Sequence, residues 1–292
     1  MASTQILKSR IRSVKSTKQI TKAMQLVAAS KMRRAQDATK ASAPYTAAAR
    51  DLLRSLSHHS SVVRHPLFTK RDVKTRLIIV IAADKGLAGA YNSNIIKLYT
   101  EQLVLDDNAG IKNTTIAVGR RAAQFVARIK DTELLGVYED LPDRPDGQEL
   151  RSILDNAKEK FTSGAVDAVD IIYTDFINSL IQTPRVLRVL PAGVYEDGDK
   201  VVTTTSSDAT YEPSAGEVLD GVAYRLVGAQ IFQALLDARA SEYSMRMVAM
   251  KNATDNASDL VDDLTLEMNK ARQGAITQEL AEISGGVEAM NE

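Results

Sequence analysis

A stretch free of glycine and proline, residues 229–273, most constrains what this chain can fold into, and Gly228 and Gly274 bracket it. Apolar or small residues recur through it at alternating steps of four and three, and only Gln233 and Thr254 interrupt the series. A 3.5-residue repeat sustained this far predicts a coiled coil, because it keeps one seam of the helix facing one partner. At 1.5 Å per residue this helix would be roughly 65–70 Å long. The predicted seam positions are Val222, Leu226, Ala229, Gln233, Leu236, Ala240, Tyr243, Met247, Met250, Thr254, Ala257, Val261, Leu264, Met268, Ala271 and Ala275.

The N-terminal segment has no glycine or proline before Pro44. Its apolar residues form a stripe whose register slips between Val14 and Ile20, which predicts a long helix with one apolar face and a basic remainder. A second amphipathic stretch, "AAARDLLRSLSHH", is expected to continue the helix after a kink or break near Pro44. The stripe consists of Leu7, Ile11, Val14, Ile20, Met24, Val27, Ala28, Met32 and Ala35.

Charge is distributed unevenly between the two ends of the chain, although the formal net charge is zero. Residues 1–40 carry ten Lys or Arg against one Asp, whereas residues 237–292 carry five bases against eleven acids. These opposite charges favour pairing between the two terminal helices. Both helices join the middle of the chain at their inner ends, so a paired arrangement must be antiparallel.

A further apolar stripe follows Gly274 near the C-terminus. Ile276, Leu280, Ile283 and Val287 recur at helical spacing where the basic N-terminal helix is expected to have ended. An apolar stripe without a partner in its own chain favours a covering surface supplied by another protein.

The middle of the chain has a different period. Four apolar runs rich in β-branched residues predict strands, and helical patterns alternate with them, which favours a mostly parallel sheet covered by helices. The predicted fold is therefore α/β, with an antiparallel coiled coil of the N- and C-terminal helices and a central Rossmann-like domain. The predicted strands are 76–83, 114–119, 167–174 and 185–192, and the predicted helices between them are 93–105, 120–130 and 147–162. The predicted segments are 1–57 (N-terminal coiled-coil helix), 70–195 (central α/β domain), 196–213 (polar loop) and 214–292 (C-terminal coiled-coil helix).

The segment 82–94, "AADKGLAGAYNSN", lies between a predicted strand and a predicted helix, where phosphate-binding loops occur. It matches neither G-x-G-x-x-G nor G-x-x-x-x-G-K-[ST], so we interpret it as a tight turn that needs glycine. His58, His59 and His65 lack a neighbouring carboxylate or cysteine pattern, and we interpret them as a solvated connector rather than metal ligands. The chain has no cysteine, which excludes disulfides and thiol catalysis. We expect no cofactor.

The basic N-terminal segment allows two other interpretations. It is rich in Ser and Thr and free of acids before Asp37, which is also typical of a mitochondrial transit peptide. It could bind nucleic acid, but Tyr45 is the only aromatic residue in the first 60, and an acidic helix is available to neutralise the segment. No apolar run approaches the ~20 residues that a membrane-spanning helix requires.

Four segments together resemble the gamma subunits of F-type ATP synthases, the central rotor shafts of those complexes. Two positions depart from the family pattern: Ala88 stands where the family often has Cys, and Val287 stands where an Ala usually follows the last glycines. The inserted cysteine pair of the redox-regulated chloroplast versions is absent. The segments are "RIRSVKSTKQITKAMQLVAASKMRRA" (10–35), "DKGLAGAYN" (84–92), "SEYSMRMVAMKNATDNA" (241–257) and "NKARQGAITQELAEISGG" (269–286).

The resemblance implies a non-catalytic subunit, one copy per complex, whose coiled coil turns inside a ring of three alpha and three beta subunits. It further implies a foot that rests on the epsilon subunit and the membrane c-ring, and peripheral association with a membrane through that ring. We expect the cytoplasmic face of a bacterial inner membrane, with the mitochondrial matrix face as the alternative. Nucleotides would bind to alpha and beta, which fits the missing phosphate loop.

The resemblance also assigns roles to residues. The residues expected to face the alpha/beta ring are Met24, Arg246, Arg272, Gln273 and Thr277. The residues expected at the tip, in an apolar sleeve, are Ile276, Leu280, Ile283 and Val287. The residues expected in the foot are Tyr211 and Glu212. Within the methionine-rich stretch, Met247 and Met250 are expected on the seam, and Met245 and Arg246 are expected to face outward.

Two other functions remain open from the residues alone. A static coiled-coil adaptor would show the same helices, and tight binding of ATP or NAD to the isolated chain would indicate a nucleotide-binding α/β enzyme.

Overall fold

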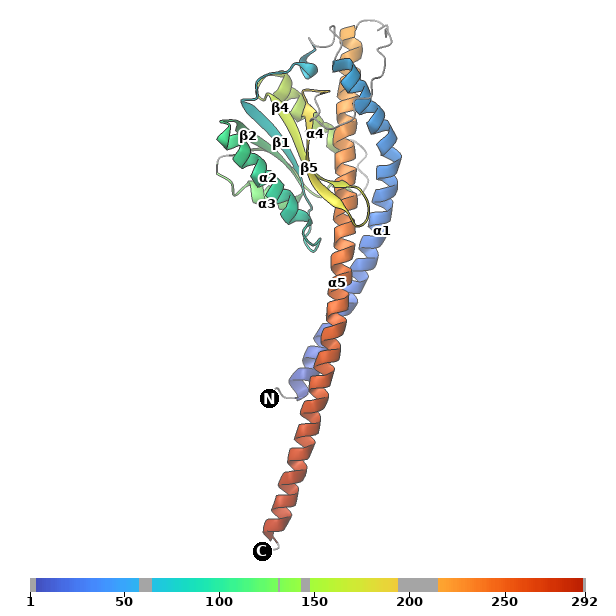
Figure 1. The fold of residues 1–292 in the computed structure, drawn as a ribbon, viewed down its shortest axis with the longest axis vertical. Helices are drawn as coiled ribbons and strands as arrows, with labels where there is room; N and C mark the ends of the chain where they lie inside the picture. The colour runs from blue at the N-terminus through green and yellow to red at the C-terminus, as the bar shows by residue number, and fades with distance from the viewer. Residues whose placement is uncertain (1–3, 58–64, 131, 143–147, 194–214, 291–292) are drawn as a thin grey trace. The chain divides into compact units, whose positions relative to one another are not determined.

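The computed structural model describes residues 4–57, 65–130, 132–142, 148–193 and 215–290. They divide into two compact units: Met1–Ala28 with Arg246–Glu292, called here the coil unit, and Ala29–Met245, called the sheet unit. The elements in chain order are α1 (Thr4–Ser57), η1 (Pro66–Phe68), β1 (Thr75–Ile81), α2 (Tyr91–Asn108), β2 (Lys112–Val118), α3 (Arg120–Val126), β3 (Glu133–Tyr138), α4 (Gln148–Thr162), β4 (Ala168–Phe176), β5 (Gln182–Leu190) and α5 (Ala215–Met290) (Figure 1).

The five strands form one sheet in the order β3-β2-β1-β4-β5. β1 pairs in parallel with both β2 and β4, β2 pairs in parallel with β3, and β5 lies antiparallel to β4. The chain therefore moves outward from β1 in one direction and then in the other, which places a topological switch point between β1 and β4. The mostly parallel sheet of the sequence analysis is confirmed.

Helices cover both faces of this sheet. One face packs against α2 and α3, and the other packs against α4 and the inner ends of α1 and α5 (Figure 1). Ile78 and Val80 of β1 point to the first face, while Leu77, Ile79 and Ile81 point to the second, and all five are buried. A strand buried on both faces has no polar alternation, which explains its continuous apolar run.

The third strand, β3, is not among the predicted strands. It lies at the edge of the sheet, and Leu134 and Leu135 are only half-buried there, with Val137 exposed. The predicted helix 120–130 is also too long, because α3 ends at Val126 and tight turns follow it.

α1 continues through Pro44 as one helix, so the expected break is wrong. Pro44 and Lys40 are both exposed. Proline has no N–H group, so Pro44 cannot donate the helical hydrogen bond to the carbonyl oxygen of Lys40. Because Lys40 is exposed, water can satisfy that oxygen.

The predicted slip in the N-terminal stripe is also wrong. Ile20 and Val27, both assigned to the stripe, are 57% exposed. The steps of four and three in fact continue without interruption from Val14 onward, but through polar residues. The buried and half-buried seam positions of α1 are Leu7, Ile11, Val14, Lys18, Thr21, Gln25 and Ala28 in the coil unit, and Met32, Ala35, Thr39, Ser42, Thr46, Ala49, Leu53 and Leu56 in the sheet unit.

In the coil unit the two helices run antiparallel, as predicted. Leu7 and Ile11 of α1 form a buried cluster with Leu264 of α5. Further along α1, the hydroxyl group of Thr254 donates a hydrogen bond to the Oγ1 atom of Thr21, at 2.8 Å. Residues further along α1 therefore contact residues earlier in α5, as in an antiparallel pair. A buried polar pair in the seam of a coiled coil is a known means of fixing register.

We expect Thr254→Val to lower the free energy of unfolding by about 1 kcal/mol, because it leaves the Thr21 hydroxyl beside an apolar group. The double change Thr21→Val and Thr254→Val should cost less than the sum of the two single changes, because either change alone already removes the hydrogen bond between the two hydroxyl groups. Urea unfolding of the four proteins in a double-mutant cycle measures the coupling. Thr265→Val is the control: its hydroxyl donates to the carbonyl of Val261 in its own helix, as the Thr254 hydroxyl can to that of Met250, so it measures the loss of such a bond without the contact to α1. Additive losses would contradict the pairing.

Candidate functional site

The carboxyl ends of the parallel strands, where open α/β sheets bind ligands, contact α5 in this chain. Asp84, just after β1, accepts hydrogen bonds at Oδ1 from the backbone N–H groups of Arg120 (3.0 Å) and Asp140 (3.2 Å). Its second oxygen lies 3.6 Å from the guanidinium of Arg239 on α5. The loops that follow β1, β2 and β3 are thus joined through one carboxylate, which explains the aspartate of the segment 82–94.

Arg239 connects α5 to these loops. Its guanidinium donates to the carbonyl oxygen of Leu141 at 2.9 Å and lies 3.3 Å from a carboxylate oxygen of Glu242. The side chains of Arg239 and Asp84 are each 11% exposed, and that of Glu242 is 5% exposed. Burial opposes the charge of Arg239, but Glu242, Tyr243 and Asp84 outweigh it and raise the pKa of the guanidinium above its ordinary value. We call Asp84, Arg239 and Glu242 the α5 clamp.

Met245 lies beside the clamp and corrects an expectation. It is half-buried and packs against Ala83, Ala88 and Tyr91, rather than facing outward. The alanine at position 88, where the family often has Cys, is buried in this contact. Met250, expected on the seam, is buried, and Met247 is half-buried.

The turn between β4 and β5 holds both terminal helices within the sheet unit. Ser244 of α5 donates a hydrogen bond to the carbonyl oxygen of Ser179 at 2.8 Å, and Gln36 of α1 donates to the hydroxyl oxygen of Ser179 at 3.2 Å. Ser241 donates to the carbonyl oxygen of Thr174 at the end of β4. Ser241 and Ser244 are fully buried, and their small side chains let α5 approach the sheet closely.

The predicted ring-contact residues lie in the coil unit. Met24 and Arg246 are half-buried, and Arg272, Gln273 and Thr277 are exposed. Thr277 donates to the carbonyl oxygen of Gln273 within α5, so its hydroxyl is tied to its own helix.

The predicted tip is a single helix with apolar side chains in the open. Ile276, Leu280 and Ile283 are 49%, 59% and 64% exposed. The last apolar contacts between the described parts of α1 and α5 in this unit involve Met268 and Ala271, and no described element accompanies α5 beyond them (Figure 1). The side chain of Val287 lies outside the described residues, as do Tyr211 and Glu212 of the predicted foot and the polar loop 196–213.

Metal and membrane sites have little support in the described part of the chain. No helix described there is both long and apolar enough to cross a bilayer. Nor do its His, Asp and Glu side chains gather in groups of three that could hold a metal ion. His58 and His59 fall outside the described residues, but His65 is buried, so its interpretation as part of a solvated connector is wrong. Its Nδ1 atom accepts from the N–H group of Leu67 and caps η1.

Known proteins match this chain over nearly its whole length. The family model described as ATP synthase matches residues 3–290. The ATP synthase gamma chain of Ralstonia nicotianae is 40% identical, and the match covers 99% of this chain and 100% of that protein. The gamma chain of Opitutus terrae is 42% identical, with 97% of each chain covered.

Solved structures show the same fold at lower identity. A chain of the Euglena gracilis mitochondrial ATP synthase, in a structure containing OSCP, F1 and the c-ring, matches with a TM-score of 0.70, 18% identity and coverage of 98% of this chain and 94% of that one. A chain of the Tetrahymena thermophila mitochondrial ATP synthase central stalk and c-ring matches with a TM-score of 0.63, 23% identity and coverage of 80% and 99%. From its matches to the family model and to these curated relatives, the chain belongs to the family of ATP synthase gamma chains.

Proposed function

We propose that this chain is the rotating central-stalk subunit of a proton-translocating ATP synthase. One copy would couple proton flow through the membrane sector to ATP synthesis or hydrolysis on a ring of three alpha and three beta subunits, without catalysing either reaction itself. The observation that carries this proposal is the lone apolar end of α5, whose exposed side chains need a covering surface. Membership of the gamma-chain family supports the same conclusion.

The mechanism follows from differential binding. A ligand shifts an equilibrium only by the difference in its affinity for two states. An asymmetric shaft inside a threefold ring would touch each beta subunit differently, and so would bias each nucleotide site toward a different affinity. By reciprocity, ATP binding and hydrolysis would turn the shaft. Apolar contacts are non-directional, so an apolar tip can turn in an apolar sleeve.

The proposal assigns surfaces to partners. Met24 and Arg246 would meet a beta subunit, and Arg272, Gln273 and Thr277 would form the upper contact with the ring. The sleeve would take Ile276, Leu280, Ile283 and Val287. Tyr211 and Glu212 would lie in the foot, against the epsilon subunit and the c-ring. The complex would sit on the cytoplasmic face of a bacterial inner membrane, since the similar gamma chains named above are bacterial.

We expect Arg246→Ala and Gln273→Ala to lower ATP-driven proton pumping in reconstituted complexes about tenfold, because each removes a hydrogen-bonding group that contributes roughly 1–2 kcal/mol when buried in a contact. Pumping is measured as acidification of vesicles, at equal amounts of assembled complex. Arg128→Ala is the control, since Arg128 is exposed on the sheet unit. Normal pumping by both variants would contradict the assigned contacts.

The same complexes distinguish a rotor from a static adaptor. A bead attached to the sheet unit should turn when ATP is added, and a bead that stays still on an active complex would favour the adaptor. A nucleotide-binding enzyme is disfavoured, because open α/β sheets bind nucleotides at the carboxyl ends of their strands. In this chain the α5 clamp lies at that edge of the sheet.

A further inference from the structure

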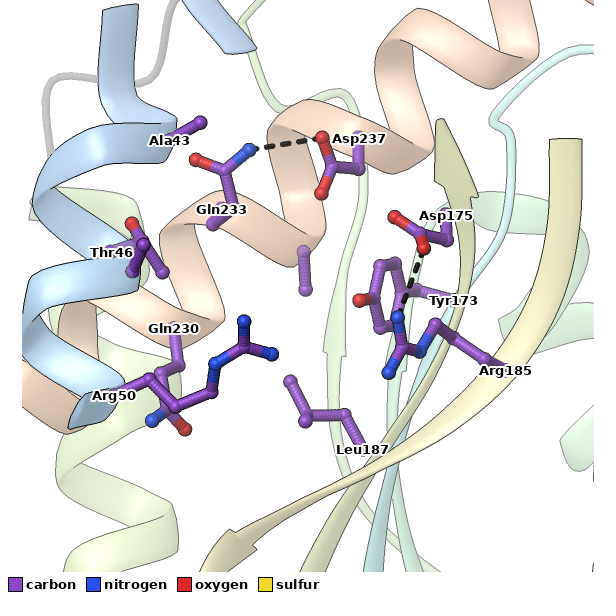
Figure 2. Close-up of a pocket in the computed structure, with 12 residues that line it drawn as sticks. Ala43, Thr46, Arg50, Tyr173, Asp175, Arg185, Leu187, Gln230, Gln233 and Asp237 are labelled. Atoms are coloured by element: carbon purple, nitrogen blue, oxygen red, sulfur yellow. Dashed lines mark hydrogen bonds and ion pairs between the residues drawn. The ribbon is translucent and has the colours of Figure 1, made fainter. Parts of the chain in front are cut away.

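A cavity of about 310 Å³ lies within the sheet unit, between the inner ends of α1 and α5 and the strands β4 and β5 (Figure 2). Its size is at the lower end of the range for small-molecule sites. It is separate from the α5 clamp and from the predicted ring contacts. The lining residues used below are Arg50, Tyr173, Asp175, Arg185, Gln233 and Asp237.

Polar groups converge on this cavity from all four elements. Arg50 reaches in from α1, and the hydroxyl of Tyr173 points into it from β4 (Figure 2). Arg185 of β5 forms an ion pair with Asp175 at 3.0 Å. Asp237 of α5 is 6% exposed and accepts a hydrogen bond from the side-chain amide of Gln233 at 3.0 Å. The lining contains four charged side chains, those of Arg50, Asp175, Arg185 and Asp237. The charges of Arg185 and Asp175 cancel, so the net charge of these four depends on whether Asp237 is ionised.

Burial keeps Asp237 largely uncharged up to neutral pH. Desolvation first, and then repulsion from Asp175, raise the pKa of Asp237 to about 7, against the hydrogen bond of Gln233, the nearby Thr39 hydroxyl and the attraction of Arg185. Burial, followed by the charge of Asp175, also raises the pKa of Tyr173 well above its ordinary value, so its hydroxyl remains a donor. While Asp237 is protonated, the charged side chains of the lining are the guanidinium groups of Arg50 and Arg185 and the carboxylate of Asp175.

We propose that this cavity is a binding site for a small oxyanion, a carboxylate or a phosphate group, held by Arg50 with help from the Tyr173 hydroxyl. A guanidinium presents paired N–H groups in the geometry that carboxylates and phosphates accept. A bound oxyanion would connect α1, α5 and the two strands, so it would stabilise the attachment of both long helices to the sheet. This site goes beyond the rotary function and does not depend on it.

Binding and protonation of Asp237 should be linked. An ionised Asp237 would repel the anion, so the competent form is the protonated one. With a pKa of about 7 that form falls from about nine-tenths of the molecules at pH 6 to about one-tenth at pH 8. The apparent dissociation constant should therefore rise about tenfold between these pH values.

The test uses calorimetric titration of the full chain with sodium sulfate, as a tetrahedral stand-in for phosphate, with sodium acetate, and with sodium chloride at matched ionic strength. We expect saturable binding of sulfate or acetate, with the stronger of the two identifying the ligand class, and no saturable binding of chloride. Arg50→Gln should abolish binding, and Arg50→Lys should retain part of it. Arg34→Gln is the matched control, because Arg34 is exposed on the same helix. A water-filled cavity would show no saturable binding, and this result, or equal binding by Arg50→Gln, would overturn the proposal.

The role of Asp237 is tested separately. Asp237→Asn fixes the uncharged form, so it should bind the oxyanion about tenfold more tightly than the parent at pH 8 and lose the pH dependence. If the parent bound the oxyanion with the same dissociation constant at pH 6 and pH 8, this role of Asp237 would be overturned.

Discussion

Replacing Arg239 with Met should lower the free energy of unfolding by about 3–5 kcal/mol, which is the range for breaking a buried ion pair by removing one partner. The change removes the guanidinium that lies near the carboxylates of Asp84 and Glu242, whose side chains are 11% and 5% exposed. It also removes the hydrogen bond to the carbonyl oxygen of Leu141. Denaturant unfolding of the full chain at neutral pH measures the loss, and hydrogen exchange in the loop after β1 reports where the structure loosens.

Two variants sharpen this test. Arg239→Lys keeps the charge but lacks the planar guanidinium that contacts both Leu141 and Glu242. It should therefore lower the free energy of unfolding by about half as much as Arg239→Met. Arg128→Met removes an exposed arginine and should change stability by less than about 0.5 kcal/mol. If Arg239→Met lost no more than Arg128→Met, the α5 clamp would not hold the helix to the sheet.

The fold was predictable where one physical requirement dominated the sequence. The apolar run 76–83 predicts β1 correctly, because a strand buried on both faces needs apolar residues at every position. β3 gives no such signal, since it is an edge strand that contains Gly136 and leaves Val137 exposed. The heptad of α5 is clear because mostly apolar residues occupy its seam. That of α1 is hidden because Lys18 and Thr21 take seam positions while apolar Ile20 is exposed.

The site was less accessible to sequence reasoning. A heptad shows which side of α5 faces α1, but not what packs on its other sides, so Met245 was expected outside although it contacts Ala88. The pairing of Asp84 with Arg239 joins residues far apart in the chain, and no spacing rule connects them. The assigned ring contacts rest on the resemblance to gamma subunits. The exposed tip is the exception, because its apolar stripe could be seen in the sequence to continue after the partner helix ends.

The α5 clamp and the cavity differ in their response to pH. In the α5 clamp, Arg239 is a cation between two carboxylates, and its raised pKa keeps it charged through the neutral range. At the cavity, Asp237 is a carboxyl group whose ionisation burial opposes. Moderate alkalinity should therefore weaken the cavity contact and leave the clamp intact.

Asp237→Asn should make the protein more stable at pH 8 by about 4 kcal/mol and change little at pH 4. In the unfolded chain this carboxyl ionises near its ordinary value of 3.8, but in the folded chain its pKa is about 7. Between these values the folded state holds a proton that the unfolded state has released, so the stability of the parent falls as pH rises, by about 1.4 kcal/mol per unit, and levels off above pH 7. Asparagine cannot ionise and escapes this loss. Urea unfolding from pH 4 to pH 8, in buffers free of sulfate, phosphate and carboxylates, measures both curves. Asp72→Asn is the control, because Asp72 is exposed. Parallel curves for the parent and Asp237→Asn would show that Asp237 ionises equally well in the folded and unfolded chain, and would remove the electrostatic basis for its link to oxyanion binding.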